Sequence, residues 1–294
     1  MAPHPAPSPL IPVSDLLALI SGSSPASPEL CLLDCRFSLA DTLAGERAYE
    51  QGHLPGAFYA HLDRDLSGAK TGLNGRHPLP TPEAMAATMG HWGVGPATQV
   101  VAYDDAGGMF AARAWWLLGW MGHAKVRVLD GGWAAWQAVE GTLSTALPER
   151  APTAVAPQAR HDWVVGTPEV LAQVMSGQAR PQGLQLLDAR TAERFRGIGE
   201  TLDPIGGHIP GALNRWYGLN LQADGQFKPP AQLHDEFTTL LADQPPSALV
   251  HQCGSGVTAC HNLLAMAQAG LGMSRLYAGS WSEWCADPSR PVAN

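Results

Sequence analysis

A cysteine that follows a strand-like segment is the residue whose type and setting most clearly suggest chemistry. Cys253 comes directly after the β-prone run 248–252, and a stretch with helical spacing follows at 258–271. Gly254 and Gly256 permit backbone conformations closed to other residues, so the loop between strand and helix can curl around the sulfur. The N–H groups of the loop would then form an anion-binding nest at the start of the helix, a setting that favours a thiolate. We therefore predict that Cys253 is a nucleophile rather than a buried packing residue.

A thiolate held in an anion nest suits two kinds of reaction. A cysteine-dependent phosphatase or arsenate reductase needs an arginine after five intervening residues, where it clamps the oxyanion through two hydrogen bonds. Ala259 occupies that position here. In sulfur transfer, the thiolate instead attacks a sulfane or mercapto sulfur, becomes a persulfide, and passes that sulfur to a second nucleophile. The missing arginine favours sulfur transfer over phosphatase or reductase chemistry.

Three sequence motifs recur within the chain in the same order and at nearly the same offset. The pairs are LLDCRFSLA at 32–40 with LLDARTAER at 186–194, GHLPGA at 52–57 with GHIPGA at 207–212, and VLDGGWAAW at 128–136 with LYAGSWSEW at 276–284. These matched landmarks indicate a duplicated domain, and the Ala- and Pro-rich stretch between the copies indicates a linker. We predict an N-terminal domain at 1–143, a linker at 144–160 and a C-terminal domain at 161–294.

Short apolar strands alternate with helices in each half, which predicts an α/β fold with a mostly parallel sheet covered on both faces. In the second half the predicted strands are 184–190, 248–252 and 275–280. Ligand sites in such sheets form at the carboxyl ends of the strands, which is where Cys253 lies. Arg36 and Arg190 each follow a strand-end aspartate, so we interpret them as members of structural ion pairs.

The composition excludes several classes of protein. The 294-residue chain is 45% hydrophobic, enough for two domain cores, but it has no apolar run of the ~20 residues that span a bilayer. Its net charge of −8, with scattered Lys and Arg, argues against nucleic acid and against an anionic membrane as partners. Five cysteines without C-x-x-C spacing suggest neither a disulfide framework nor a zinc site. The N-terminal residues lack the features of a signal peptide, and we expect the protein in the reducing cytoplasm.

With these motifs the sequence resembles the two-domain rhodanese family, whose members are thiosulfate and 3-mercaptopyruvate sulfurtransferases. The resemblance is carried by DCR and DAR, GHLPGA and GHIPGA, CGSGVTAC and GSWSEW, and it extends over nearly the whole chain. It implies tandem rhodanese-like domains, each a five-stranded parallel sheet flanked by helices, and a reaction that uses no metal or organic cofactor. It also implies an inactive N-terminal copy. Asp104 of that copy falls opposite Cys253 at an offset of 149 residues, and an aspartate cannot carry sulfur.

The resemblance further implies a proton relay that crosses between the domains. Thiosulfate-type members usually carry basic residues directly after the cysteine, whereas mercaptopyruvate-type members have a loop like CGSGVT, the one present here. In the latter members the loop serine joins an aspartate and a histidine from the N-terminal domain. The matching positions are Ser255, Asp63 in HLDRD and His77 in GRHPLP. We expect Asp63 to orient His77 while the donor thiol is activated, which requires the catalytic loop to face the domain interface.

The carboxylate of the donor needs a cation, and Arg194 in AERFRG matches the family's substrate-binding arginine. Mercaptopyruvate-type members generally have a second arginine shortly before GHIPG, but residues 200–207 contain none, and Arg196 is the nearest substitute. Thiosulfate therefore stays a candidate donor beside 3-mercaptopyruvate. The remaining predicted substrate contacts are the loop residues Gly254, Gly256, Val257 and Thr258. The expected acceptor is a small thiol, thioredoxin or cyanide, and the rival interpretation without catalysis is a rhodanese-like binding module.

Overall fold

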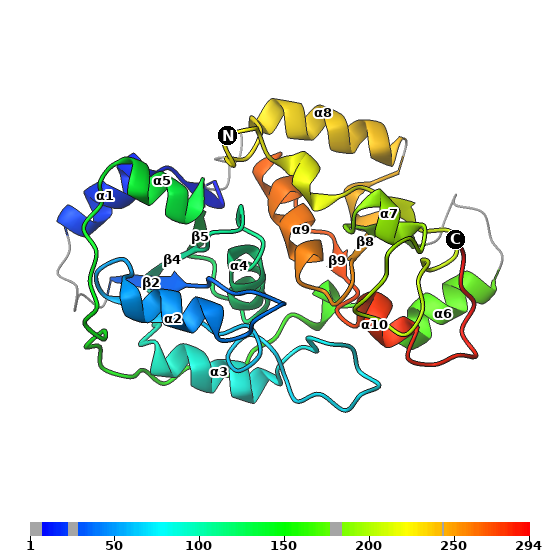
Figure 1. Cartoon of the computed structure of the whole chain (residues 1–294), viewed down its shortest axis with the longest axis horizontal. Coiled ribbons are helices and arrows are strands. Elements are labelled where there is room, and N and C mark those ends of the chain that lie inside the picture. The colour runs from blue at the N-terminus through cyan, green and yellow to red at the C-terminus, as the bar shows by residue number, and fades with distance from the viewer. Residues whose placement is uncertain (1–7, 23–28, 177–183, 243) are drawn as a thin grey trace, which may run out of the picture.

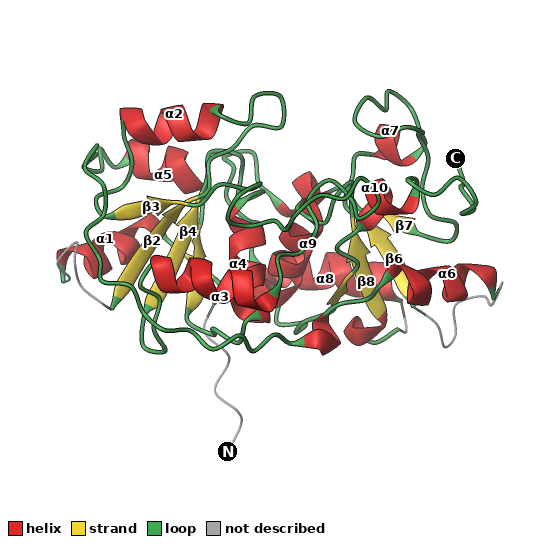
Figure 2. Cartoon of the chain, turned by 90° about the horizontal axis from the view of Figure 1, so that it is seen from below, coloured by secondary structure: helices red, strands yellow, loops and turns green. Residues whose placement is uncertain are grey.

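The computed structural model describes residues 8–22, 29–176, 184–242 and 244–294, which form two α/β halves lying side by side (Figures 1 and 2). In the N-terminal half, five parallel strands stand in the order β1-β5-β4-β2-β3. The elements of this half are β1 (Leu10–Ile11), α1 (Val13–Ser21), β2 (Leu30–Asp34), α2 (Ala44–Gln51), β3 (Ala57–Tyr59), α3 (Pro82–His91), β4 (Gln99–Tyr103), α4 (Ala111–Trp120), β5 (Val126–Leu129) and α5 (Gly132–Ala138). Buried side chains of α1 and α5 pack on one face of the sheet, and those of α3 and α4 pack on the other.

The C-terminal half repeats the arrangement with one strand fewer. Its four parallel strands stand in the order β7-β6-β8-β9. The elements are α6 (Thr167–Met175), β6 (Gln185–Asp188), α7 (Ala192–Phe195), β7 (Leu213–Asn214), α8 (Pro230–Leu241), β8 (Leu249–Gln252), α9 (Thr258–Gln268), β9 (Arg275–Leu276) and α10 (Ser280–Trp284). The expectation of five strands in each sheet is therefore wrong for this half. In the segment that matches β1, the 3-10 turn at His161–Trp163 ends directly before Val164, and Val164 forms an isolated bridge to Leu276 in place of a strand.

The repeated motifs have a shared structural purpose, which is to tie a strand end to the following GH loop. Arg36 binds the Asp34 carboxylate at 2.6 Å, and the same nitrogen donates to the Gly52 carbonyl at 2.7 Å. The second half repeats these contacts with the corresponding residues Asp188, Arg190 and Gly207. The interpretation of Arg36 and Arg190 as members of structural ion pairs is confirmed.

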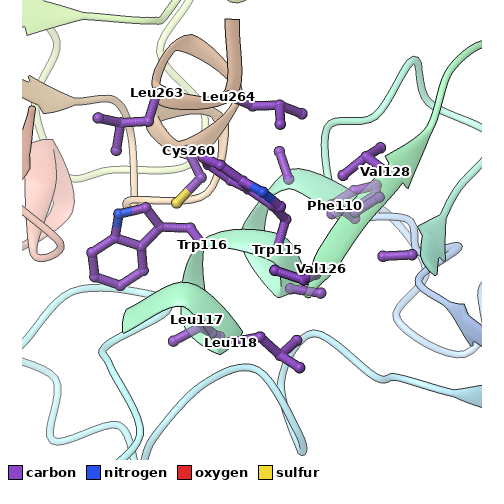
Figure 3. Close-up of a cluster of buried hydrophobic side chains, with 14 of the residues drawn as sticks. Phe110, Trp115, Trp116, Leu117, Leu118, Val126, Val128, Cys260, Leu263 and Leu264 are labelled. Carbon is purple, nitrogen blue, oxygen red and sulfur yellow. The ribbon is translucent and has the colours of Figure 1, made fainter. Parts of the chain in front are cut away.

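The two halves share one apolar core along α4 and α9 (Figure 3). Trp115 and Trp116 of α4 lie against Cys260, Leu263 and Leu264 of α9, and all five side chains are buried. Because this core is continuous, the loop before α4 and the loop before α9 are held at fixed positions relative to each other. The loop before α9 is the candidate catalytic loop, and the loop before α4 is its copy in the N-terminal half.

Buried histidines are expected to make the stability of this fold depend on pH. Burial lowers the pKa of His77 and His251 from 6.5 to about 3, and that of His261 to about 4. As the pH falls below 6.5, the unfolded chain takes up a proton at each of these residues while the folded chain does not. The free energy of unfolding should therefore fall by up to ~1.4 kcal/mol per pH unit for each histidine until its folded pKa is reached.

His251 offers a matched test of that dependence. Its ring is fully buried, and neither of its ring nitrogens has a hydrogen-bond partner in the part of the chain that the structure describes. Urea unfolding of His251→Leu between pH 7 and 5 should show a shallower loss of stability than the unaltered protein, by up to ~1.4 kcal/mol per pH unit. Parallel curves for the two proteins would show that His251 is protonated in the folded state as readily as in the unfolded one.

Candidate active site

Cys253 lies where β8 ends, at the carboxyl edge of the second sheet, and only 2% of the residue is exposed. Its N–H donates to Ser280 Oγ at 3.1 Å, and its carbonyl accepts from the N–H of Trp281 at 3.0 Å. Ser280 has a left-handed backbone, with φ 55°, which is strained for any residue except glycine. The internal repeat contains a signal for this left-handed backbone, because a glycine, Gly132, occupies the same position in the first copy. The start of α10 thus fixes the backbone of Cys253.

The two loop glycines serve different purposes. Gly256 has φ 78°, and a Cβ there would lie 2.4 Å from the carbonyl oxygen of Ala278, so both conformation and space require glycine. Gly254 is not left-handed, which corrects the expectation that both glycines adopt restricted conformations. A Cβ on Gly254 would instead lie 2.7 Å from Nη2 of Arg76 and 3.7 Å from the guanidinium of Arg194. Glycine at this position therefore leaves room for two cations beside the cysteine.

The N-terminal copy of the loop is filled by a carboxylate. Asp104 follows β4 as Cys253 follows β8. Its two carboxylate oxygens accept hydrogen bonds, each 2.8 Å long, from the backbone N–H groups of Ala106, Gly108, Phe110 and Ala111. Burial raises the pKa of Asp104, and these N–H groups oppose that shift. The loop geometry is thus an anion-binding nest, which in this copy holds a side chain of the protein itself.

The C-terminal copy has the same kind of loop around a thiol. The N–H groups of Ser255, Gly256 and Val257 have no hydrogen-bond partner among the described residues. The helix α9 begins at Thr258, so its positive N-terminal end also faces the loop. These N–H groups are available to an anion that forms on Cys253.

The structure brings Ser255, His77 and Asp63 together across the interface between the halves. His77 Nδ1 lies 2.7 Å from Ser255 Oγ. The other ring nitrogen, Nε2, lies 3.6 Å from Asp63 Oδ1, which is beyond hydrogen-bond distance. Lys70, a residue that the sequence did not point to, donates to the same Asp63 oxygen at 2.8 Å. Ser255 therefore contacts His77 directly, whereas Asp63 acts on the ring at longer range and is partly neutralised by Lys70.

Burial keeps His77 neutral. It lowers the pKa of the ring to about 3, and the Asp63 carboxylate offsets only part of that shift. A neutral imidazole has one N–H and one acceptor nitrogen, and the carboxylate favours the N–H on Nε2. Nδ1 is then the acceptor for the Ser255 hydroxyl, and because the ring is neutral at pH 7 this nitrogen is available as a base for a proton released near the loop during a reaction.

The two arginines predicted to bind substrate lie in different surroundings. Arg194 in α7 lines the same cavity as Cys253, and its Nη2 donates to both carboxylate oxygens of Glu200 at 2.9 Å. The side chain of Arg196 is 58% exposed, lies 3.9 Å from Glu193 and does not line the cavity. The structure thus brings Arg194 to the cysteine and leaves Arg196 outside.

A cavity of about 260 Å³ lies between the halves and joins these groups. The N-terminal half contributes Leu39, Arg76, His77, Met109 and Phe110. The C-terminal half contributes Arg190, Thr191, Arg194, Trp216, Tyr217, residues 253–255, Val257 and Thr258. Of the predicted loop contacts, Gly254, Val257 and Thr258 line the cavity and Gly256 does not. The volume is smaller than the ~300–1,000 Å³ of most drug-sized pockets, so the cavity suits a ligand of few atoms.

Arg113 is a buried contact of the site that the sequence reasoning missed. It lies in α4 with no exposed surface, and burial lowers its pKa. Its Nη1 donates to the carbonyl of Gly256 and its Nη2 to the carbonyl of His77, both at 3.2 Å. The sequence does contain a signal for Arg113, which is the single charged residue of the apolar run AARAWWLLGW. A charged side chain buried by such a run needs hydrogen-bond or ion-pair partners. Arg113 positions the histidine segment against the cysteine loop.

A family model described as a rhodanese-like domain matches this chain twice, at residues 13–139 and 167–287. The chain belongs to the rhodanese family. Among its rhodanese relatives, a Pseudomonas aeruginosa protein named "Probable 3-mercaptopyruvate sulfurtransferase" is 49% identical over 270 residues, covering 91% of this chain and 93% of the relative. The thiosulfate sulfurtransferase of Rattus norvegicus is 32% identical over 271 residues, covering 89% of this chain and 87% of the relative.

A solved rhodanese structure supports the fold. The crystal structure of a 3-mercaptopyruvate sulfotransferase from Escherichia coli superimposes with a TM-score of 0.74 at 31% identity, covering 94% of this chain and all of that one. The relatives at these levels of identity are named as sulfurtransferases. The tandem rhodanese α/β fold and the enzyme class predicted from the sequence, a sulfurtransferase, are confirmed.

In residues 8–22, 29–176, 184–242 and 244–294, no helix combines the length and the hydropathy needed to cross a membrane. No group of three or more His, Cys, Asp or Glu side chains among these residues is arranged to hold a metal ion.

Proposed function

We propose that this rhodanese protein transfers a sulfane sulfur from 3-mercaptopyruvate or thiosulfate to a thiol or cyanide through a persulfide on Cys253. The observation that carries the proposal is that Cys253 and the Ser255–His77 pair open onto one cavity. The cysteine stands at a loop whose N-terminal copy holds an anion, the Asp104 carboxylate. A persulfide anion on Cys253 would be stabilised by the equivalent backbone N–H groups.

With 3-mercaptopyruvate, the Cys253 thiolate attacks the donor sulfur and forms the new S–S bond. The donor's C–S bond breaks, and its electron pair leaves on carbon as the enolate of pyruvate. The proton of the donor thiol passes to Ser255 and His77, and it is then delivered to the enolate carbon, which yields pyruvate and the persulfide anion. An acceptor thiolate or cyanide takes the outer sulfur and regenerates the Cys253 thiolate. Atoms and charge balance without any metal or organic cofactor.

With thiosulfate, the same attack on the outer sulfur expels sulfite. Sulfite leaves as a stable anion, so this step needs no proton from the relay. The two donors therefore place different demands on His77 while sharing Cys253 and the cationic groups around the cavity.

The phosphatase and arsenate reductase alternative is disfavoured by the loop itself. Residue 259 is alanine, so the loop supplies no guanidinium to an oxyanion held above Cys253. The non-catalytic binding module is disfavoured because Cys253, Ser255 and His77 are all present and aligned on one cavity.

We propose that the protein works in the cytoplasm. All five cysteines are free and buried, which fits a reducing compartment. The net charge of −8 argues against nucleic acid and an anionic membrane as partners, and we propose small-molecule donors and a thiol acceptor such as thioredoxin. Residues 1–143 and 161–294 are proposed as the two domains, with 144–160 as the linker.

Turnover of thiosulfate and 3-mercaptopyruvate, measured side by side with cyanide as the acceptor, tests the proposed function. We expect turnover of both donors.

Arg194→Ala should lower kcat/KM for 3-mercaptopyruvate by roughly ten- to a hundredfold, the effect of losing one charge-assisted contact. Arg196→Ala should change it by less than ~2-fold, because that side chain lies outside the cavity. Equal losses in both variants, or none in either, would mean that Arg194 does not bind the donor.

A further inference from the structure

The segment before GHIPG lacks the second substrate arginine, but the structure places another cation at the cavity. Arg76 comes from the N-terminal half, directly before His77, and lines the cavity together with Arg194 and Cys253. We infer that Arg76 and Arg194 form a two-arginine clamp for the anionic group of the sulfur donor. The inference rests on the proposed function and names the residues that hold the donor.

The two guanidinium groups converge on the same point. A Cβ on Gly254 would lie 2.7 Å from Nη2 of Arg76 and 3.7 Å from both Nη1 and Nη2 of Arg194. Gly254 directly follows Cys253, so the clamp lies next to the sulfur. A basic side chain at position 254 would occupy the space that the Arg76 guanidinium fills here. Arg76 therefore supplies, next to Cys253, the positive charge that the loop CGSGVT lacks.

Each arginine of the clamp has a carboxylate behind it and free N–H groups in front. Arg76 Nη1 pairs with Asp203, and Arg194 pairs with Glu200. Both carboxylate side chains are at least 96% buried, so they fix the guanidinium groups from within the protein. Among the described residues, no hydrogen bond reaches Arg76 Nη2 or Arg194 Nη1. These N–H groups are available for a ligand.

Asp203 links the two halves of the clamp. One of its oxygens pairs with Arg76. The other lies 3.6 Å from Arg194 Nη2 and has no hydrogen-bond partner in the described part of the chain. Burial raises the pKa of Asp203, and the contact with Arg76 opposes that shift. The carboxylate therefore holds the two cations near each other, where they would otherwise repel.

The other arginines near the site are not available for this task. Arg190 lines the cavity, but its Nη2 is held by the Asp188 carboxylate and the Gly207 carbonyl. Its Nη1 has no hydrogen-bond partner among the described residues, but this nitrogen is buried 3.8 Å from Glu200 and has no surface open to a ligand. Arg196 is exposed and lies outside. Arg76 and Arg194 are thus the pair that can face the carboxylate of 3-mercaptopyruvate or the sulfonate end of thiosulfate. Both groups are oxyanions that accept two or more charge-assisted hydrogen bonds.

The affinity of the Cys253→Ser protein for pyruvate and for sulfite, measured by calorimetry, reports ligand binding without the reaction, because this variant cannot turn over either donor. Adding Arg76→Ala to the Cys253→Ser protein should weaken pyruvate binding by roughly ten- to a hundredfold, and adding Arg194→Ala should do the same. Sulfite binding in the same variants shows whether the sulfonate uses the same clamp. In the protein with Cys253 intact, Arg76→Ala should raise KM for 3-mercaptopyruvate much more than it lowers kcat, and Arg76→Lys should restore part of the loss.

Arg275→Ala is the matched control. Arg275 is similarly exposed and also pairs with a carboxylate, Glu169, but it stands at the amino end of β9, away from the cavity. Pyruvate binding and KM in Arg76→Ala that equal those of Arg275→Ala would overturn the clamp while leaving the proposed function standing. If the unaltered protein turns over neither donor, the proposed function fails. Loss of pyruvate binding in Arg76→Ala would then still support the clamp as an anion site.

Discussion

Cys253→Ser is expected to lose both sulfur labelling and turnover, with kcat reduced by roughly 10⁴-fold or more for either donor. An alcohol at neutral pH is not anionic, and it cannot hold the transferred sulfur as a persulfide. The change is nearly isosteric, so the loop and its contacts from Ser280 and Trp281 should persist. Cyanide-dependent thiocyanate formation measures turnover, and protein mass after donor treatment measures labelling.

Cys285→Ser is the control for that result. Cys285 is also buried, and burial raises its pKa to about 11, so it stays protonated at neutral pH and is a poor nucleophile. Its replacement should leave labelling and turnover within ~2-fold of the unaltered protein. Substantial turnover in Cys253→Ser, or its loss in Cys285→Ser, would move the nucleophile to another residue.

His77→Ala should have the second largest effect, and the effect should depend on the donor. Without the ring, Ser255 loses its 2.7 Å partner and the thiol proton of 3-mercaptopyruvate has no nearby base. We expect kcat for this donor to fall by ~10²–10⁴-fold, the usual contribution of general acid–base catalysis. Turnover of thiosulfate should fall by less than ~10-fold, because sulfite leaves without a proton.

His77→Gln is the companion variant, since it can still hydrogen-bond to Ser255 but cannot carry a proton at neutral pH. It should show the same donor-dependent loss as His77→Ala, although its packing is better preserved. Equal losses for both donors in both variants would indicate that His77 only supports the structure of the loop. A loss for 3-mercaptopyruvate in the alanine variant alone would assign the effect to the hydrogen bond rather than to proton transfer.

The features that the sequence predicted correctly are those whose residues lie close together in the chain. The cysteine loop, the repeated motifs and the strand–helix alternation each lie within a few residues, so their period and composition show directly in the chain. The pairing of Arg36 with Asp34 belongs to the same class, because a single residue separates the partners. The absence of a fifth strand from the second sheet was not predictable in this way, since the 3-10 turn at His161–Trp163 that stands directly before Val164 has no signal in the repeat.

The missed parts of the site depend on contacts between residues far apart in the chain. Arg113 reaches the carbonyl of Gly256 only because α4 and α9 pack together. Arg76 reaches Gly254 only because the histidine segment crosses the interface, and its signal in the sequence is no more than its place directly before His77. The family pattern located Ser255 and His77, but it could not show that Lys70 shares the Asp63 carboxylate. Such contacts follow from tertiary packing rather than from residue spacing.

The most direct test of the central claim is the mass of the peptide that contains Cys253, measured after brief treatment of the intact protein with 3-mercaptopyruvate. The account predicts an added mass of one sulfur atom on this peptide, no such addition on the peptides that contain the other four cysteines, and its removal by cyanide with release of thiocyanate. Turnover with no added sulfur on Cys253 at any time point, or sulfur added equally to several cysteines, would contradict the account.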